Sequence, residues 1–196
     1  MMKRKTILAA VLAAVAALIC AFTLAGCGGD EVEKIEGSSG LEYQLSADGT
    51  YYTVTGVGTC SDVDVVIGNW HNDLPVRGIG ERVLRNFDYD VNSITVSQGI
   101  DLFGAAAVSN FTMKRLVLPN GIETYGSAAF IRSEKLEEIV FGTGLKKIEY
   151  DSFMGCGEDV TIYFRGTEEE WAEVEIESQG NELIDGYTVV CNYTGA

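Results

Sequence analysis

Residues 113–130 read MKRLVLPNGIETYGSAAF, and residues 136–156 read LEEIVFGTGLKKIEYDSFMGC. Each segment contains a short apolar triplet whose side chains alternate inward and outward, as they do in a strand: Leu116-Val117-Leu118 in the first and Ile139-Val140-Phe141 in the second. The two triplets lie 23 residues apart, and matching triplets stand at 94–96 and 162–164. A fixed period of this length indicates a protein built from stacked repeats.

The second half of each unit repeats as well. Three apolar positions recur after the strand triplets, and they are held by Ile100, Ile122 and Leu145, by Phe103, Tyr125 and Ile148, and by Val108, Phe130 and Phe153. An earlier, looser copy covers residues 65–87 and carries an insertion around Trp70. Because one unit cannot bury its own apolar face, the units must stack with parallel strands at about 4.8 Å spacing. We therefore expect a right-handed solenoid that is mostly β with short helical turns.

The unit resembles the leucine-rich repeat of BspA-like bacterial surface proteins, which reads roughly L-x-x-I-x-I-P, a turn, and I-G-x-x-A-F-x-x-C. Residues 113–119 (MKRLVLP), 125–130 (YGSAAF) and 153–156 (FMGC) carry the resemblance, which covers about residues 40–196. The copies are degenerate, since only one keeps Pro after the strand. Glu149 replaces the Gly of the pattern, so its turn must avoid a positive φ or accept strain. The resemblance implies a leucine-rich-repeat solenoid that serves surface attachment or adhesion.

Both ends of such a stack need a cap, because they would otherwise expose apolar surface and unpaired backbone. Residues 41–62 are predicted to form an N-terminal hairpin cap, and the leucine-rich repeats fill residues 63–164. Residues 165–196 are predicted to form the C-terminal cap. There Thr167 and Glu170 form a capping box for a short helix that carries Trp171, and residues 187–193 (YTVVCNY) form a last strand.

The N-terminal residues 1–26 are predicted to be a lipoprotein signal peptide, because three basic residues at 3–5 precede an apolar run from Ile7 to Phe22. The run ends in LAGC at 24–27, which resembles the lipobox of bacterial lipoproteins. This resemblance implies that Cys27 is acylated, with palmitate-like chains, and becomes the mature N-terminus. Residues 27–40 then form a lipidated flexible tether. An uncleaved transmembrane helix is the alternative, and either reading places residue 28 onward outside the cytoplasm.

Charge and cysteine content exclude several classes of function. Lys and Arg number 14 and Asp and Glu 29, so the net charge of −15 repels DNA and RNA and predicts no nucleic-acid partner. Three cysteines remain after residue 27, an odd number whose spacing matches no zinc site: Cys60, Cys156 and Cys191. We therefore expect buried thiols rather than a disulfide framework or a metal site. The single His71 has no Ser or Cys partner at a meaningful spacing, so we predict no catalytic residues and no cofactor.

Candidate binding residues lie at the outward position of each strand triplet. They form a row of β-branched residues that ends in a tyrosine: Val66, Thr95, Val117, Val140 and Tyr163. Arg115 and Glu138 stand beside this row, and Trp70 is a further candidate because loops often carry function. The alternatives are that the row only stabilises the sheet, that Arg115 and Glu138 form a cross-strand ion pair, and that Trp70 folds over the first repeat.

These features predict a non-catalytic binding module, not an enzyme, that is lipid-anchored to the bacterial cell membrane on its extracytoplasmic side. Its strand face would bind an extracellular protein or glycan, as in adhesion. The alternative is an envelope scaffold or accessory subunit whose strand face is buried within an assembly.

Overall fold

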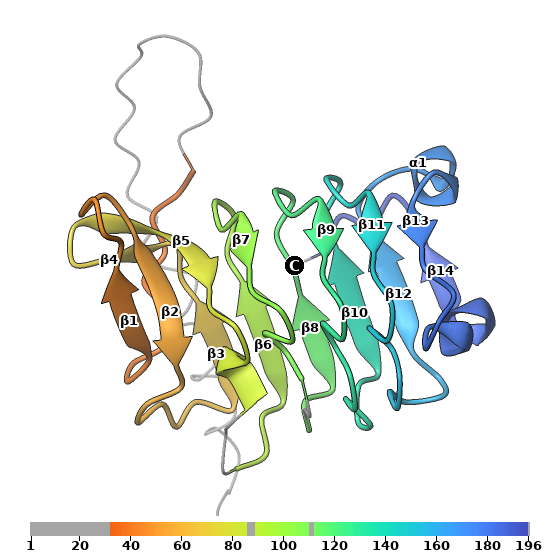
Figure 1. Ribbon diagram of the computed structural model, residues 1–196, viewed down its shortest axis with the longest axis horizontal. Helices are drawn as coiled ribbons and strands as arrows, with labels where there is room; N and C mark the ends of the chain where they lie inside the picture. The colour runs from red at the N-terminus through yellow and green to blue at the C-terminus, as the bar shows by residue number, and fades with distance from the viewer. Residues whose placement is uncertain (1–31, 86–88, 110–111, 196) are drawn as a thin grey trace, which may run out of the picture. The chain divides into compact units, whose positions relative to one another are not determined.

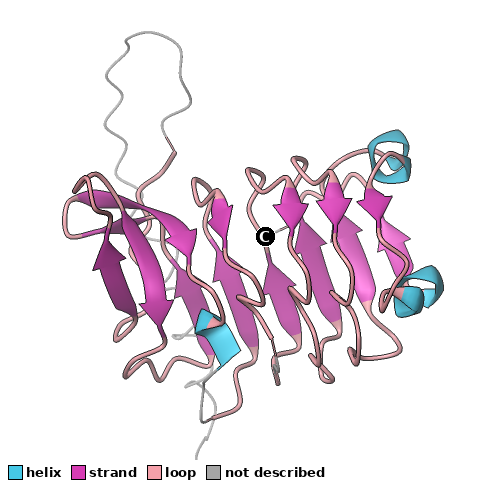
Figure 2. Ribbon diagram, viewed as in Figure 1, coloured by secondary structure: helices cyan, strands magenta, loops and turns pink. Residues whose placement is uncertain are grey.

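The computed structural model describes residues 32–85, 89–109 and 112–195, which form a mostly β solenoid with little helix (Figures 1 and 2). The predicted signal peptide, Cys27 and the first residues of the predicted tether lie outside the described residues, as do Phe87 and Phe111. Among the described residues, no helix has the length and apolarity needed to span a membrane.

A six-stranded parallel sheet forms one face of the solenoid (Figure 1). Its strands lie in the order of the sequence: β3 (Asp64–Ile67), β6 (Ser93–Val96), β8 (Arg115–Val117), β10 (Glu138–Phe141), β12 (Thr161–Phe164) and β14 (Thr188–Val190). Ile94 pairs with Leu116, Leu116 with Ile139, and Ile139 with Ile162. The predicted repeat and its register are therefore confirmed.

The remaining strands form two further sheets (Figure 1). One contains β9 (Thr124–Tyr125), β11 (Lys147–Ile148) and β13 (Glu175–Ile176); the other contains β1 (Glu42–Leu45), β2 (Tyr52–Gly56), β4 (Trp70–His71), β5 (Leu74–Ile79) and β7 (Leu102–Phe103). Between the sheets the repeated apolar positions are buried, and Phe130 has its ring centre 5.9 Å from that of Phe141 and 5.3 Å from that of Phe153. This continuous aromatic stack joins neighbouring repeats through one core.

Corresponding residues in four successive turns of the solenoid adopt a left-handed backbone. Arg82, Ala106, Ala128 and Asp151 have φ of 57°, 49°, 59° and 60°. Glu149 is not among these residues, so its turn avoids the positive φ, which was the first of the two predicted outcomes. The Gly of the repeat pattern instead permits a close approach, since a Cβ at Gly104 would lie 2.5 Å from the Glu81 nitrogen of the preceding turn.

The C-terminal end is closed as the sequence predicts. The side chain of Thr167 accepts a hydrogen bond from the Glu170 N–H (3.1 Å), and the Glu170 carboxylate accepts one from the Thr167 N–H (2.8 Å). This capping box starts α1 (Glu168–Ala172), and Trp171 packs on the rings of Phe141 and Phe164. A 3₁₀ turn, η2 (Glu182–Gly186), leads into β14; a similar turn, η1 (Val83–Arg85), lies in the first repeat.

At the N-terminal end, β1 and β2 form the predicted antiparallel hairpin. The prediction of a flexible tether over residues 27–40 needs correction for the segment 33–38, which lies against β3. The Ser38 N–H donates to the Val66 carbonyl (2.8 Å), the Val66 N–H donates to Ser38 Oγ (3.0 Å), and Glu36 forms a parallel bridge with Trp70. The first edge of the sheet is covered because its backbone groups find partners there.

Candidate functional site

Two rows of side chains project from the outer face of the six-stranded sheet. The pairing of neighbouring strands aligns Val66, Thr95, Val117, Val140 and Tyr163 in one row, as predicted, and extends it to Val190. The second row contains Asp64, Ser93, Arg115, Glu138, Thr161 and Thr188. The structure thus brings six of the seven candidate binding residues onto one surface, which we call the strand face.

The middle of the strand face is less exposed than the sequence predicts. Val117 is 4% exposed and Val140 is 0% exposed, whereas Thr95 and Tyr163 are half-buried. The expectation of an open row of side chains is therefore wrong at Val117 and Val140.

Residues 191–195, which we call the return segment, fold back over this part of the strand face. After β14 the Asn192 N–H donates to the Gly166 carbonyl (2.7 Å) and the Tyr193 N–H to the Phe164 carbonyl (3.1 Å). The ring of Tyr193 then lies 4.5 Å from that of Tyr163 on β12, and its hydroxyl accepts a hydrogen bond from Arg115 on β8 (3.1 Å). Because β10 lies between β12 and β8, this side chain crosses the face at Val140. Figure 1 shows the chain turning back across the sheet after β14.

Two guanidinium groups lie beside Tyr193. Arg115 forms the predicted ion pair with Glu138, and both side chains are half-buried. Burial lowers the pKa of Arg115, but its hydrogen bonds to Tyr193 and Glu138 outweigh that effect and raise the pKa above its ordinary value. Arg165 donates to the Leu118 carbonyl (2.7 Å), and burial lowers the pKa of its guanidinium. Both guanidinium groups therefore lie close to the Tyr193 side chain, and Glu138 balances the charge of Arg115.

Trp70 lies elsewhere. It belongs to β4, which pairs antiparallel with β5 through a turn at Asn72 and Asp73, and the predicted insertion is a hairpin rather than an irregular loop. The Lys34 ammonium lies 3.7 Å from the centre of the Trp70 ring, an arrangement that favours a cation–π contact. The adjacent His71 stacks on Tyr43 with ring centres 3.8 Å apart. These contacts fix the hairpin to the N-terminal cap, so Trp70 is separate from the strand face.

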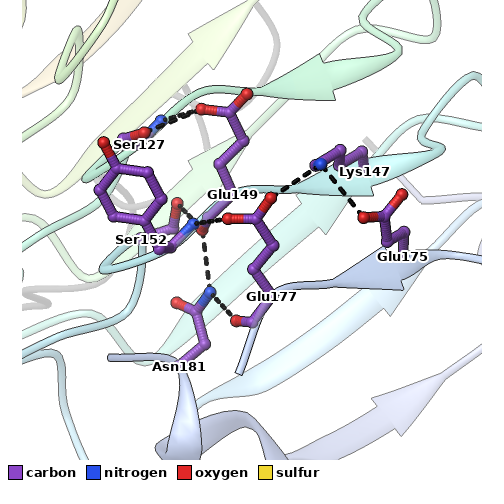
Figure 3. A network of polar contacts seen from close by, with 8 residues as sticks. Ser127, Lys147, Glu149, Ser152, Glu175, Glu177 and Asn181 are labelled. Atoms are coloured by element: carbon purple, nitrogen blue, oxygen red, sulfur yellow. Dashed lines mark hydrogen bonds and ion pairs between the residues drawn. The ribbon is translucent and has the colours of Figure 1, made fainter. Parts of the chain in front are cut away.

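A polar network at the last turn is the other concentration of ionisable groups (Figure 3). Lys147 Nζ lies 2.7 Å from Glu177 and 3.1 Å from Glu175, and its hydrogen bond lowers the pKa of the Glu177 carboxyl. A general acid needs the opposite shift, so Glu177 does not have the raised pKa of a general acid. Glu149 accepts hydrogen bonds from the Ser127 N–H (2.9 Å) and hydroxyl (2.8 Å), which ties two turns together.

Two buried asparagines close the ends of the stack, and the sequence analysis missed both. Asn181, 2% exposed, accepts from the Phe153 N–H (2.9 Å) and donates to the carbonyls of Glu149 (2.9 Å) and Glu177 (2.7 Å). Asn69, 7% exposed, closes the other end near β3, where its side chain accepts a hydrogen bond from the Ile35 N–H (2.8 Å).

The sequence analysis also missed Tyr193 and Arg165 as parts of the strand face. Among the described residues, no group of three or more His, Cys, Asp or Glu side chains is placed to hold a metal ion.

The family model of the BspA-type leucine-rich repeat region matches residues 72–172 in six copies, which is more than half of the 196 residues. The crystal structure of a leucine-rich cell surface protein from Faecalibacterium prausnitzii A2-165 is similar, with a TM-score of 0.50 and 20% sequence identity. The match covers 70% of this chain and 41% of that chain, so this chain spans about two-fifths of that length and shares its fold. No curated protein matches the chain. With this repeat model covering most of the stacked strands, the chain belongs to the BspA-type leucine-rich repeat family.

Proposed function

We propose that this protein is a lipid-anchored, non-catalytic binding module of the bacterial cell surface, which takes an extracellular protein or glycan on its strand face. The family and the cell-surface protein of similar fold support the surface location. The order of basic residues, apolar run and LAGC supports an anchor at Cys27.

The observation that carries the proposal is the alignment of the outward rows. Six parallel strands in one register align β-branched, aromatic and charged side chains at regular spacing, and the row is accessible on either side of the covered Val117 and Val140. Such a surface suits many shallow contacts with an extended partner, because each repeat adds a similar contact.

The test uses two threonines on different faces. Thr95 is half-buried on β6 in the strand face, whereas Thr124 is exposed on β9 in the three-stranded sheet. We expect Thr95→Arg to reduce capture of surface components at least tenfold and Thr124→Arg to leave it unchanged, with both variants keeping the wild-type circular dichroism spectrum. Equal capture by wild type and Thr95→Arg would remove the strand face from the binding surface.

One observation favours the scaffold alternative. β14 ends the six-stranded sheet, and among the described residues no strand pairs with its outer edge, where Val190 is 39% exposed. A free edge of this kind can pair with another chain. Light scattering of residues 28–196 separates the two functions: a monomer at all concentrations supports a module for an external ligand, and concentration-dependent association supports a scaffold.

A further inference from the structure

The tyrosine slot is a side-chain-sized site on the strand face, formed by Val117, Val140, Tyr163 and Arg115. The two valines are 4% and 0% exposed although they project from the outer face of the sheet. Tyr163 provides an aromatic wall, with its ring at 38° to that of Tyr193. Arg115 provides a hydrogen-bond donor at the far end, 3.1 Å from the Tyr193 hydroxyl.

The chemistry of the slot matches a phenol. Apolar valines contact the face of an aromatic ring, a second ring packs beside it, and a guanidinium donates to the hydroxyl at the ring's end. Tyr193 packs beside the Tyr163 ring and accepts the hydrogen bond from Arg115, and the burial of Val117 and Val140 agrees with a ring that lies over them. Arg165 interacts electrostatically with Tyr193 as well and adds a second guanidinium near the phenol.

The return segment is held less firmly than the strands beneath it. Its residues Asn192 and Thr194 are exposed, and Tyr193 itself is only half-buried. Asn192 has a φ of 56°, a left-handed backbone that an L-residue adopts at some cost. The return segment can therefore leave the face while β14 remains paired with β12, because the three β14–β12 residue pairs end at Val190.

We propose that the tyrosine slot is the recognition site of the strand face, and that Tyr193 fills it in place of a ligand. The ligand is an extended peptide segment that inserts its own tyrosine once the return segment leaves. This inference rests on the proposed function and selects a protein ligand over a glycan.

The test compares the full wild-type chain with Tyr193→Ala. The probe is the synthetic peptide VVSNYTGA, which copies residues 189–196 with serine in place of the cysteine, together with a second peptide in which its tyrosine is alanine. Binding is followed by the methyl NMR signals of Val117 and Val140. We expect Tyr193→Ala to bind the tyrosine peptide at least tenfold more tightly than wild type, because the attached Tyr193 competes at an effective concentration in the millimolar range.

A double variant, Tyr193→Ala with Arg115→Gln, should bind the tyrosine peptide several-fold more weakly than Tyr193→Ala, since glutamine keeps the apolar stem but loses the guanidinium. The proposal is overturned if Tyr193→Ala shows no shift at about 10 mM peptide, a concentration above the usual effective concentration of a short tether. Equal affinity for the tyrosine and alanine peptides also overturns it.

Hydrogen exchange keeps the proposal testable if Tyr193→Ala folds poorly. In the wild-type chain the Tyr193 N–H donates to the Phe164 carbonyl, so added tyrosine peptide should accelerate its exchange; unchanged exchange at saturating peptide contradicts the slot. The Thr95→Arg capture assay separates the two proposals. Capture that is lost in Thr95→Arg but unaffected by the slot variants keeps the strand face and rejects the slot. If the Thr95→Arg variant captures surface components as well as wild type does, the strand face itself is rejected.

Discussion

Asn181→Ala removes the buried amide that closes the last turn of the solenoid. The substitution leaves the Phe153 N–H without its acceptor in a fully buried position, which costs about 1–3 kcal/mol. The Glu149 carbonyl keeps a partner, because it also accepts a hydrogen bond from Ser152 Oγ (2.8 Å). The hydrogen bond to the Glu177 carbonyl is lost as well. Because Glu177 is half-buried and water can reach it, this loss adds about 0.5–1 kcal/mol.

The free energy of unfolding should therefore fall by about 1.5–4 kcal/mol in Asn181→Ala. Urea denaturation measures this change as a lower midpoint with an unchanged m-value. Hydrogen exchange should show the Phe153 amide as the most affected position. Asn181→Asp should be no less destabilised, because its carboxylate can accept from Phe153 but would face two carbonyl oxygens that need donors.

Asn69→Ala is the matched control at the other end of the stack. Asn69 makes the same number of hydrogen bonds, but its partners Ile35 and Glu33 lie in the exposed segment 33–38, where water replaces the lost contacts. We expect a loss of about 1 kcal/mol there. A loss below about 1 kcal/mol for Asn181→Ala, or a larger loss for Asn69→Ala, would refute the assignment of Asn181 as the buried closing residue.

The remaining predictions concern the anchor, the turns and the thiols. Cys27→Ser should abolish acylation and release the protein from the membrane fraction, and unchanged retention with normal processing would defeat the anchor. Ala128→Gly should raise the free energy of unfolding by about 0.5–1 kcal/mol because Ala128 has a φ of 59°, whereas Ala129→Gly, at a buried site without positive φ, should lower it; equal effects in urea would contradict the turn geometry. Burial raises the pKa of the Cys156 thiol from about 9 to about 11, so the folded state holds this proton more tightly and stability should fall as pH rises through this window. Iodoacetamide should modify the half-buried Cys191 before Cys156, and mass spectrometry that found Cys156 modified first in the folded protein would contradict its burial.

The sequence predicts the repeat correctly because its signals are local and periodic. The apolar residues Ile94, Leu116, Ile139 and Ile162 recur at a nearly fixed spacing, and only stacking buries them all. The capping box at α1 is likewise a local pattern, with both partners three residues apart. Such features depend on neighbours that the sequence itself places together.

The covered middle of the strand face could not be predicted in the same way. Residues 187–193 read as one strand, but β14 ends at Val190, and the left-handed Asn192 turns the chain back over β12 and β10. Asparagine tolerates that conformation, yet nothing local shows that Tyr193 will reach Arg115, 78 residues earlier in the chain. The contact is long-range and depends on the completed sheet.

The N-terminal segment shows a different source of error. The glycine- and serine-rich composition of residues 27–40 is typical of a flexible linker, but composition does not reveal that Ser38 pairs with the edge of β3 and Glu36 with Trp70 of β4. The hairpin at Trp70 could have been recognised, because Asn72 and Asp73 are residue types that accept the two left-handed positions of a tight hairpin turn.

The stacking of the strands in one register is tested most directly by the distance between two spin labels, attached to cysteines that replace Asp64 and Thr188. Both side chains are exposed in the second row of the strand face, on the first and last strands of the sheet. Five strand spacings separate them, so pulsed electron paramagnetic resonance on residues 28–196, with the remaining cysteines changed to serine, should give a backbone separation of about 24 Å. A narrow distribution near that value supports the stacked repeats, whereas a mean beyond about 35 Å, or no defined distance, would contradict them.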